Sequence, residues 1–329
     1  MEKSKKMSKG WKIFLSILCI LVFIVGILSI LSHAVYHRSL MASGCEWFIG
    51  NFRDNTTDNA TVEELEAKRS EPEPEFVLEQ KLKSPVTEGS YQNLKIYTLN
   101  ENEESPILVY IHGGAYVRES TKYHWRMLDK LSQQSGCEIR SIHYPLTPWH
   151  TWEDSYPSIT QYYLEVKRDN PERMVYMGGD SAGGGLALGV AINITNERNP
   201  APDGLILLSP WVETTETNPD IPPYEKVDPM LNSKGLRSCA QVWAGDEPLE
   251  DWHISPINGN LSQLKNVHLF VGTREMFYPD VTLLYQKLQE LGVESYLSVG
   301  EGMNHVFQVY PTPEGKKSIS EIADLLSSS

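Results

Sequence analysis

Hydrophobic residues divide the chain into one long apolar segment near the N-terminus and a regular series of short apolar segments from about residue 94 onward. Positions 13–31 form an uncharged, nearly all-apolar run of 19 residues. A helix of that length rises by about 28 Å, close to the roughly 30 Å of a bilayer's hydrocarbon core. The pattern therefore predicts a transmembrane helix over residues 13–31.

The short apolar segments alternate between strand-like and helix-like patterns. The continuous apolar run at 107–111 is typical of a strand that is buried on both faces of a sheet. Strands are predicted at 94–99, 107–111, 138–143, 175–177, 205–208, 267–271 and 293–299, and helices at 123–131, 152–166, 182–194, 281–291 and 318–326. This alternation predicts an α/β fold, with a mostly parallel sheet covered by helices on both faces.

Two segments stand outside that alternation. Residues 32–85 are predicted to be a connector that can contribute to a cap, with a short helix starting where Thr61 and Glu64 form a capping-box pattern. Residues 211–260 are rich in proline and tryptophan and show little periodicity, which favours an irregular lid over the main domain. The predicted organisation is a tail at 1–12, an anchor at 13–31, the connector at 32–85 and an α/β domain at 86–329 that carries the lid.

Charges around the apolar run predict its orientation. Five lysines lie within residues 3–12, and positive flanks stay in the cytoplasm, so the rest of the chain is expected outside it. The alternative is a cleaved signal peptide, because Ser32-His33-Ala34 offers the small residues that a signal peptidase accepts. The run is longer than the usual core of a signal peptide, which favours a retained anchor in a lipid bilayer.

The overall composition excludes some partners. A net charge of −14 argues against nucleic acid, because phosphate binding requires a basic face. There is no phosphate-binding or dinucleotide-binding glycine pattern, and no cysteine pair has metal-ligand spacing, so no cofactor or metal is expected. The sequence gives no indication of the oligomeric state.

The segment Gly179-Asp180-Ser181-Ala182-Gly183 carries the strongest chemical signal. It is a G-x-S-x-G run that follows a predicted strand and opens a predicted helix. A serine on such a tight turn projects its hydroxyl at the top of a sheet, and its neighbours must be small because a Cβ would clash there. Ser181 is therefore the predicted nucleophile.

A serine nucleophile needs a base and an acid that orients the base, here in the chain order serine, acid, histidine. His305 is the predicted base, because it alone of the nine histidines lies in a glycine-rich loop after the last predicted strand. Glu275 is the preferred acid, since it follows the strand at 267–271. Asp280 is the alternative acid, although it can instead cap the helix that begins near it.

The developing oxyanion needs hydrogen-bond donors. His112-Gly113-Gly114-Ala115 follows the buried strand at 107–111, and glycines there let backbone N–H groups approach a substrate oxygen. Gly113 and Gly114 are predicted to supply two donors and Ala182 the third.

Together these motifs resemble those of the hormone-sensitive-lipase-like esterases, an α/β-hydrolase family. The resemblance covers about residue 94 to the C-terminus and rests on these segments: His112–Ala115, Gly179–Gly184, Tyr144–Pro148, Gly272–Glu275 and Gly302–Phe307. Ala115, Pro145 and Glu275 depart from the family's usual glycine, arginine and aspartate. The resemblance implies an α/β-hydrolase fold and hydrolysis of modest-sized acyl esters through an acyl-enzyme, without a cofactor.

The sequence thus predicts a membrane-anchored serine carboxylesterase that acts on small-molecule esters. Two alternatives stay open. The same residues cleave amides in peptidases and amidases, and the same fold also serves as a catalytically silent binding module.

Overall fold

The structure is a computed structural model that describes residues 8–52 and 58–327. Residues 1–7 of the predicted tail lie outside these ranges. An eight-stranded sheet runs in the order β1-β2-β4-β3-β5-β6-β7-β8. Its strands are β1 (Val86–Tyr91), β2 (Leu94–Leu99), β3 (Ile107–Ile111), β4 (Glu138–His143), β5 (Val175–Asp180), β6 (Gly204–Leu208), β7 (Val267–Gly272) and β8 (Ser295–Gly300). Only the pairs β1–β2 and β2–β4 are antiparallel and the other five are parallel, so the mostly parallel sheet predicted from the sequence is confirmed.

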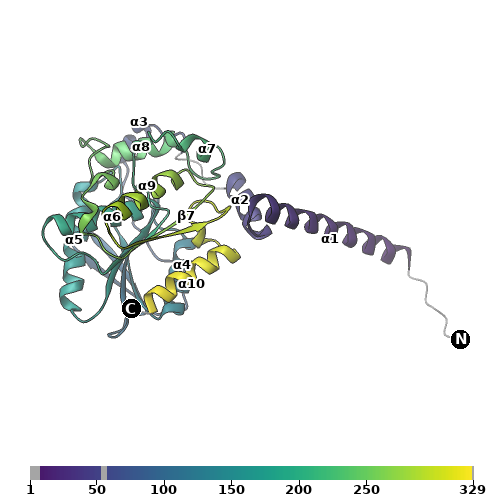
Figure 1. Cartoon of the computed structure of the whole chain (residues 1–329), viewed down its shortest axis with the longest axis horizontal. Helices are drawn as coiled ribbons and strands as arrows, with labels where there is room; N and C mark the ends of the chain where they lie inside the picture. Colours follow the sequence, from purple (N-terminus) through teal and green to yellow (C-terminus); the bar gives the residue numbers. More distant parts are fainter. Residues whose placement is uncertain (1–7, 53–57, 328–329) are drawn as a thin grey trace.

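Helices cover both faces of this sheet (Figure 1). One face packs against α5 (Trp152–Asp169), α6 (Ser181–Asn196) and α9 (Tyr278–Glu290), and the other against α4 (Lys122–Ser135) and α10 (Pro313–Ser327). The central strands β3, β5 and β6 are buried along their whole length. All five predicted helices are present, each with bounds within five residues of the predicted ones. This burial fixes the strand ends at which the candidate residues lie.

The segment predicted as an irregular lid contains more regular structure than expected. It includes α7 (Ile221–Glu225), α8 (Ser233–Ala244) and the 3-10 turn η2 (Pro256–Asn258), and a further turn, η3 (Leu261–Gln263), follows it. Helix α8 buries one face against the main core through residues such as Leu236, Ala240 and Trp243, which recur with helical spacing. The prolines and tryptophans around α8 obscure this short periodic stretch in the sequence.

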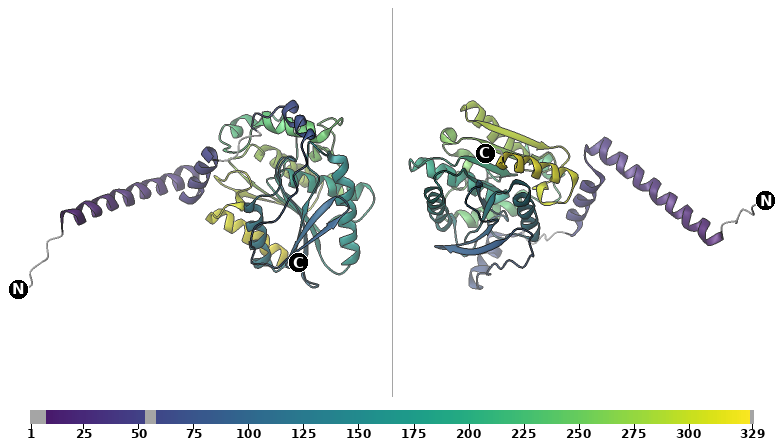
Figure 2. Two further views of the ribbon diagram at one scale, coloured as in Figure 1. Left: turned by 180° about the vertical axis from the view of Figure 1, so that it is seen from behind. Right: turned by 90° about the horizontal axis from the view of Figure 1, so that it is seen from below.

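The N-terminal part forms three helices and a turn: α1 (Lys9–Tyr36), α2 (Leu40–Phe52), α3 (Val62–Ala67) and η1 (Lys68–Ser70). Helix α1 leaves the domain as a single rod in every view (Figures 1 and 2). It is long and apolar enough to cross a membrane, and none of its apolar window is buried in the protein. Helix α3 begins with the capping box that Thr61 and Glu64 predict, and it packs on α8.

Candidate active site

Ser181 lies at a tight turn between β5 and α6. Its φ of 53° is in the left-handed region, which a serine adopts only under strain from its surroundings. Gly179 and Gly183 flank the turn, and a Cβ added to either would collide with the backbone oxygen of Ile111 on β3. The sequence therefore uses glycines where the turn meets the neighbouring strand, and this close packing holds Ser181 in its strained conformation at the carboxyl end of the sheet.

His305 and Glu275 form a buried pair. His305 Nδ1 lies 2.6 Å from Glu275 Oε2, and both side chains are almost fully buried. The other carboxylate oxygen of Glu275 accepts hydrogen bonds from the Gly272 N–H at 2.6 Å and the Ser209 hydroxyl at 2.8 Å. Burial by itself lowers the pKa of His305, but the carboxylate of Glu275, together with those of Asp228 and Asp180, outweighs burial, so the pKa of this imidazole is raised. The contact fixes the edge of the imidazole that carries Nδ1, and it leaves Nε2 for another partner.

Ser181 and His305 line one cavity of about 430 Å³. Gly113, Gly114 and Ala115 line the same cavity, together with apolar side chains from α2, α8 and the segment after His305. Within the described ranges, the structure records no hydrogen bond between the Ser181 hydroxyl and His305. Such contacts are often long before substrate binds.

Asp280, the alternative acid, lies elsewhere. It occupies the first turn of α9, where its carboxylate accepts a hydrogen bond from Asn218 Nδ2 at 2.6 Å. The two residues line a separate open depression of about 780 Å³ that contains neither Ser181 nor His305. Burial raises the pKa of Asp280 to about 6. Asp280 is not the N-cap residue of α9, which is Phe277, so the predicted capping role is wrong.

The loop after β3 differs from the prediction at Gly113, whose N–H is predicted from the sequence to be an oxyanion donor. The Gly113 N–H already donates to Asp180 Oδ1 at 3.0 Å, so its single proton is not available to a substrate oxygen. A Cβ at Gly113 would also collide with the Asp180 carboxylate, which explains why glycine is needed there. Asp180 in turn accepts from the Tyr110 hydroxyl at 2.6 Å and contacts His124 Nε2 at 3.1 Å. Burial tends to raise the pKa of Asp180, but these partners lower it to about 2.

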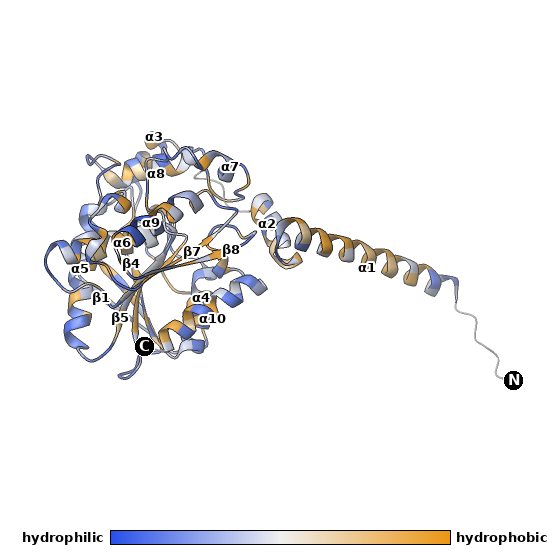
Figure 3. Cartoon of the chain, in the orientation of Figure 1, coloured by the Kyte–Doolittle hydropathy of each residue, from blue (hydrophilic) through white to orange (hydrophobic). Residues whose placement is uncertain are grey.

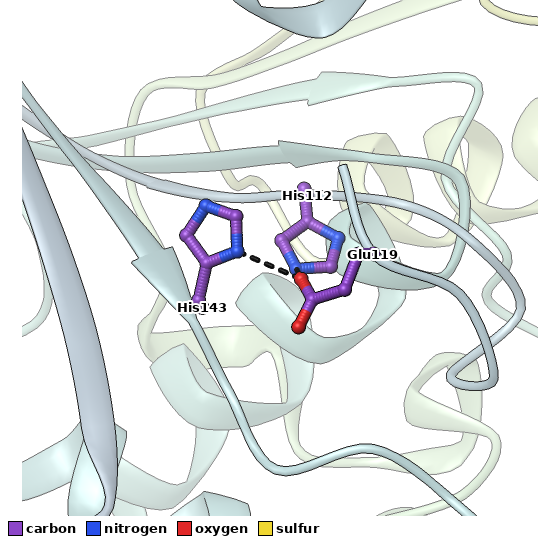
Figure 4. A group of neighbouring side chains, drawn as sticks. All are labelled: His112, Glu119 and His143. Atoms are coloured by element: carbon purple, nitrogen blue, oxygen red, sulfur yellow. Dashed lines mark hydrogen bonds and ion pairs between the residues drawn. The ribbon is translucent and has the colours of Figure 1, made fainter. Parts of the chain in front are cut away.

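The side chains of His112, Glu119 and His143 form a cluster beside the same loop (Figure 4). His143 Nδ1 lies 2.7 Å and His112 Nε2 3.4 Å from the same oxygen of Glu119. His112 Nδ1 lies 2.8 Å from the Gly113 carbonyl oxygen and can donate to it. Burial tends to raise the pKa of Glu119, but the two imidazoles lower it to about 2.

The cluster also has the donor types of a divalent metal site, with its ligand atoms within 4.8 Å of one another. However, the ring of His143 is stacked against Phe76 and Trp125, and its Nε2 is buried without a hydrogen-bond partner. Metal-binding histidines almost always bond through their second nitrogen to an outer partner. The hydrogen-bonded support of the Gly113 carbonyl therefore accounts for the cluster better than a metal does.

Two residues near the pair were not singled out in the sequence. Ser209 donates to Glu275 and accepts a hydrogen bond from the Val306 N–H at 3.0 Å, which ties the two loops together. Asp228 accepts backbone hydrogen bonds from Met230, Leu231 and Met276, and its charge raises the pKa of His305 after the larger effect of Glu275. Ser209 directly follows β6, so the rule that sites lie at strand ends could have found it. No sequence pattern points to Asp228, because it lies within the lid segment, which shows little periodicity and contains no predicted strand end.

Comparison with known proteins agrees with the fold described above. A family model described as the alpha/beta hydrolase fold matches residues 108–309. An esterase of Acinetobacter venetianus is 26% identical over 227 residues, covering 68% of this chain and 75% of that protein. The hormone-sensitive lipase of Bos taurus is 27% identical over 230 residues, covering 66% of this chain but 28% of the lipase. A solved esterase of the bacterial hormone-sensitive lipase family superposes with a TM-score of 0.75 at 24% identity, covering 88% of this chain and 98% of that one. On the extent of the family match, the chain belongs to the α/β-hydrolase family.

Proposed function

We propose that this protein is a membrane-anchored serine carboxylesterase with Ser181, His305 and Glu275 as its catalytic residues. The observation that carries the proposal is the buried 2.6 Å contact between His305 and Glu275, beside a cavity that His305 shares with Ser181. The esterases and lipases among the relatives support the reaction class.

In the proposed reaction, Ser181 Oγ attacks the ester carbonyl carbon while His305 Nε2 takes the hydroxyl proton. The tetrahedral intermediate then collapses, and His305 returns that proton to the departing alcohol. Water next attacks the acyl-enzyme and gives a proton to His305. When this second tetrahedral intermediate collapses, the bond from the acyl carbon to Ser181 Oγ breaks, His305 returns the proton to Oγ, and the acid leaves. Glu275 keeps the imidazole oriented and balances its transient positive charge.

We assign the oxyanion donors to the N–H groups of Gly114, Ala115 and Ala182. A trans peptide directs its C=O and N–H to opposite sides. Because the Gly113 carbonyl is held by His112, the Gly114 N–H of the same peptide is turned away from that cluster, and Gly114 lines the cavity. Ala115 also lines the cavity, and its φ of 53° takes the left-handed conformation that a glycine adopts more easily. Each such donor lowers the barrier by on the order of 3 kcal/mol.

The reaction class is tested by turnover of aryl esters from acetyl to long acyl, beside the anilide of one of the same acids. We expect ester hydrolysis to exceed anilide hydrolysis, because an amine is a poorer leaving group than a phenol. A preference for the anilide would favour a peptidase or amidase instead. Lack of turnover with every substrate, together with no labelling by a fluorophosphonate, would favour a binding module.

The anchor is tested separately on membranes from cells that express the full chain. We expect the protein to stay in the pellet after alkaline-carbonate extraction, because α1 places an uncharged stretch of 19 residues across the hydrocarbon core. A protease added outside the cytoplasm should then digest the catalytic domain. Release into the supernatant with a shortened N-terminus would instead indicate a cleaved signal peptide.

A further inference from the structure

We propose that α2 lies in the membrane interface and forms the entrance through which acyl chains pass from the bilayer to Ser181. The inference rests on the proposed esterase function and extends it to a substrate class, esters whose acyl chain is dissolved in a bilayer. Its starting point is that α2 lies between the apolar helix α1 and the α/β domain (Figure 3) and that residues of α2 also line the cavity of the candidate site.

Helix α2 presents an exposed apolar face to its surroundings. Met41, Trp47, Phe48 and Phe52, which we call the α2 apolar face, are each between 51% and 63% exposed. The only charged residue of the helix, Glu46, turns inward, where Arg274 donates to it at 2.8 and 3.0 Å and Arg38 also contacts it. An uncharged face rich in aromatic residues is typical of helices that lie in the boundary between headgroups and acyl chains.

The same helix reaches the candidate site. Phe48, Ile49 and Phe52 line the cavity that contains Ser181 and His305. Phe48 and Phe52 are also more than half exposed, so they lie at the mouth of the cavity rather than at its base. On the inner side, Leu231 and Leu236 continue the apolar lining. An acyl chain can thus remain against apolar side chains from the mouth inward.

Polar contacts hold α2 against the catalytic domain. The Arg38 Nη1 donates to the Gly302 carbonyl at 2.8 Å, three residues before His305. Ser39 donates through its hydroxyl to Glu314 at 2.9 Å and through its backbone N–H at 2.5 Å. These contacts join the segment between α1 and α2 to the loop that carries His305 and to the start of α10. The entrance is therefore fixed relative to the site.

Helix α2 begins only a short distance from the end of the predicted membrane helix α1. Three residues, His37 to Ser39, separate the last residue of α1 from the first residue of α2, a span of at most about 14 Å. Interfacial helices bury their apolar face by about 5–10 Å into the headgroup region. If α1 crosses the bilayer, α2 must begin at its surface. We therefore commit to the bilayer as the partner of the α2 apolar face.

The test uses the full chain reconstituted in phosphatidylcholine vesicles, with Trp47→Glu as the variant. Trp47 belongs to the α2 apolar face but does not line the cavity. We expect kcat/KM for p-nitrophenyl palmitate held in the vesicles to fall on the order of tenfold, because a charge opposes insertion of the face. Hydrolysis of water-soluble p-nitrophenyl acetate should stay within about twofold of the wild type. Leu291→Glu, at an exposed apolar residue before β8, is the matched control and should change neither rate.

A second measurement reports contact directly. Brominated phosphatidylcholine should quench tryptophan fluorescence more in the wild type than in Trp47→Phe, and Trp47→Phe should keep the palmitate activity. Equal loss of acetate and palmitate activity in Trp47→Glu would overturn the proposal, since α2 would then only support the site. Unchanged palmitate activity, unchanged quenching, or a vesicle-independent dimer that dissociates in Trp47→Glu would overturn it as well. Failure of the proposed function itself is distinct, because the wild type would then not hydrolyse the acetate.

Discussion

Ser181→Ala should abolish ester hydrolysis, with kcat falling by on the order of 10⁴ to 10⁶. Removing the serine from a catalytic triad leaves only the acceleration that comes from binding and the oxyanion donors. The substitution deletes one oxygen on a side chain that is already nearly buried, so the strained turn and the adjoining glycines are kept. The measurement is turnover of an acetyl aryl ester, with circular dichroism and the melting temperature as checks on folding.

Ser90→Ala provides the matched control, because Ser90 is an exposed serine on the edge strand β1. It should retain full activity and fluorophosphonate labelling, whereas Ser181→Ala should lose both. A folded Ser181→Ala protein that kept more than a tenth of the activity would assign the nucleophile to another residue.

The sheet could be predicted because its central strands are continuous apolar segments, which are typical of strands buried on both faces. The run at 107–111 and the Gly-rich turn around Ser181 need only local rules, and both are where the sequence predicts them. β1 carries no such signal, since Val86–Tyr91 is mostly polar and exposed and becomes a strand only by pairing with β2. Helix α2 contains Gly44 and Gly50, which disfavour a helix, and it is held by contacts such as Glu46 to Arg274, 228 residues away. No local pattern reports a contact of that kind.

In the candidate site, too, some residues could be predicted from local sequence and others could not. Glu275 is the preferred acid in the sequence because functional residues of such sheets lie at the ends of strands. In the structure Glu275, and not Asp280, contacts His305. The same reasoning chose Gly113 as a donor and was wrong. A glycine shows that the backbone can approach closely, but the direction of its N–H depends on Asp180, which lies 67 residues further along the chain.

Glu275→Gln should lower kcat/KM by on the order of 10³ to 10⁴ and move the acid limb of the pH profile. The glutamine can still accept from Gly272 and Ser209 through one oxygen, which leaves its NH₂ group facing His305 Nδ1. The Nδ1 atom must then accept a hydrogen bond, and the proton moves to Nε2, the atom that has to accept the proton of Ser181. The loss follows from this wrong tautomer.

The pH dependence has a definite sign. Activity requires neutral His305, and Glu275 raises the pKa of that imidazole despite burial. The wild type should therefore lose activity as the pH falls through a value above the ordinary imidazole pKa of about 6.5. In Glu275→Gln the stabilising carboxylate is gone while burial remains, so the limb should shift to lower pH. The measurement is kcat/KM for an acetyl aryl ester between about pH 5 and 9.

Asp280→Asn makes the same chemical change at the rival carboxylate. Asp280 lies on α9, bonded to Asn218 and away from the cavity, so its variant should keep activity within about threefold and leave the acid limb in place. A limb that moved in Asp280→Asn but stayed fixed in Glu275→Gln would transfer the orienting role to Asp280. Such a result would mean that the 2.6 Å contact between Glu275 and His305 does not set the pKa of His305 in the free enzyme, the state that kcat/KM reports.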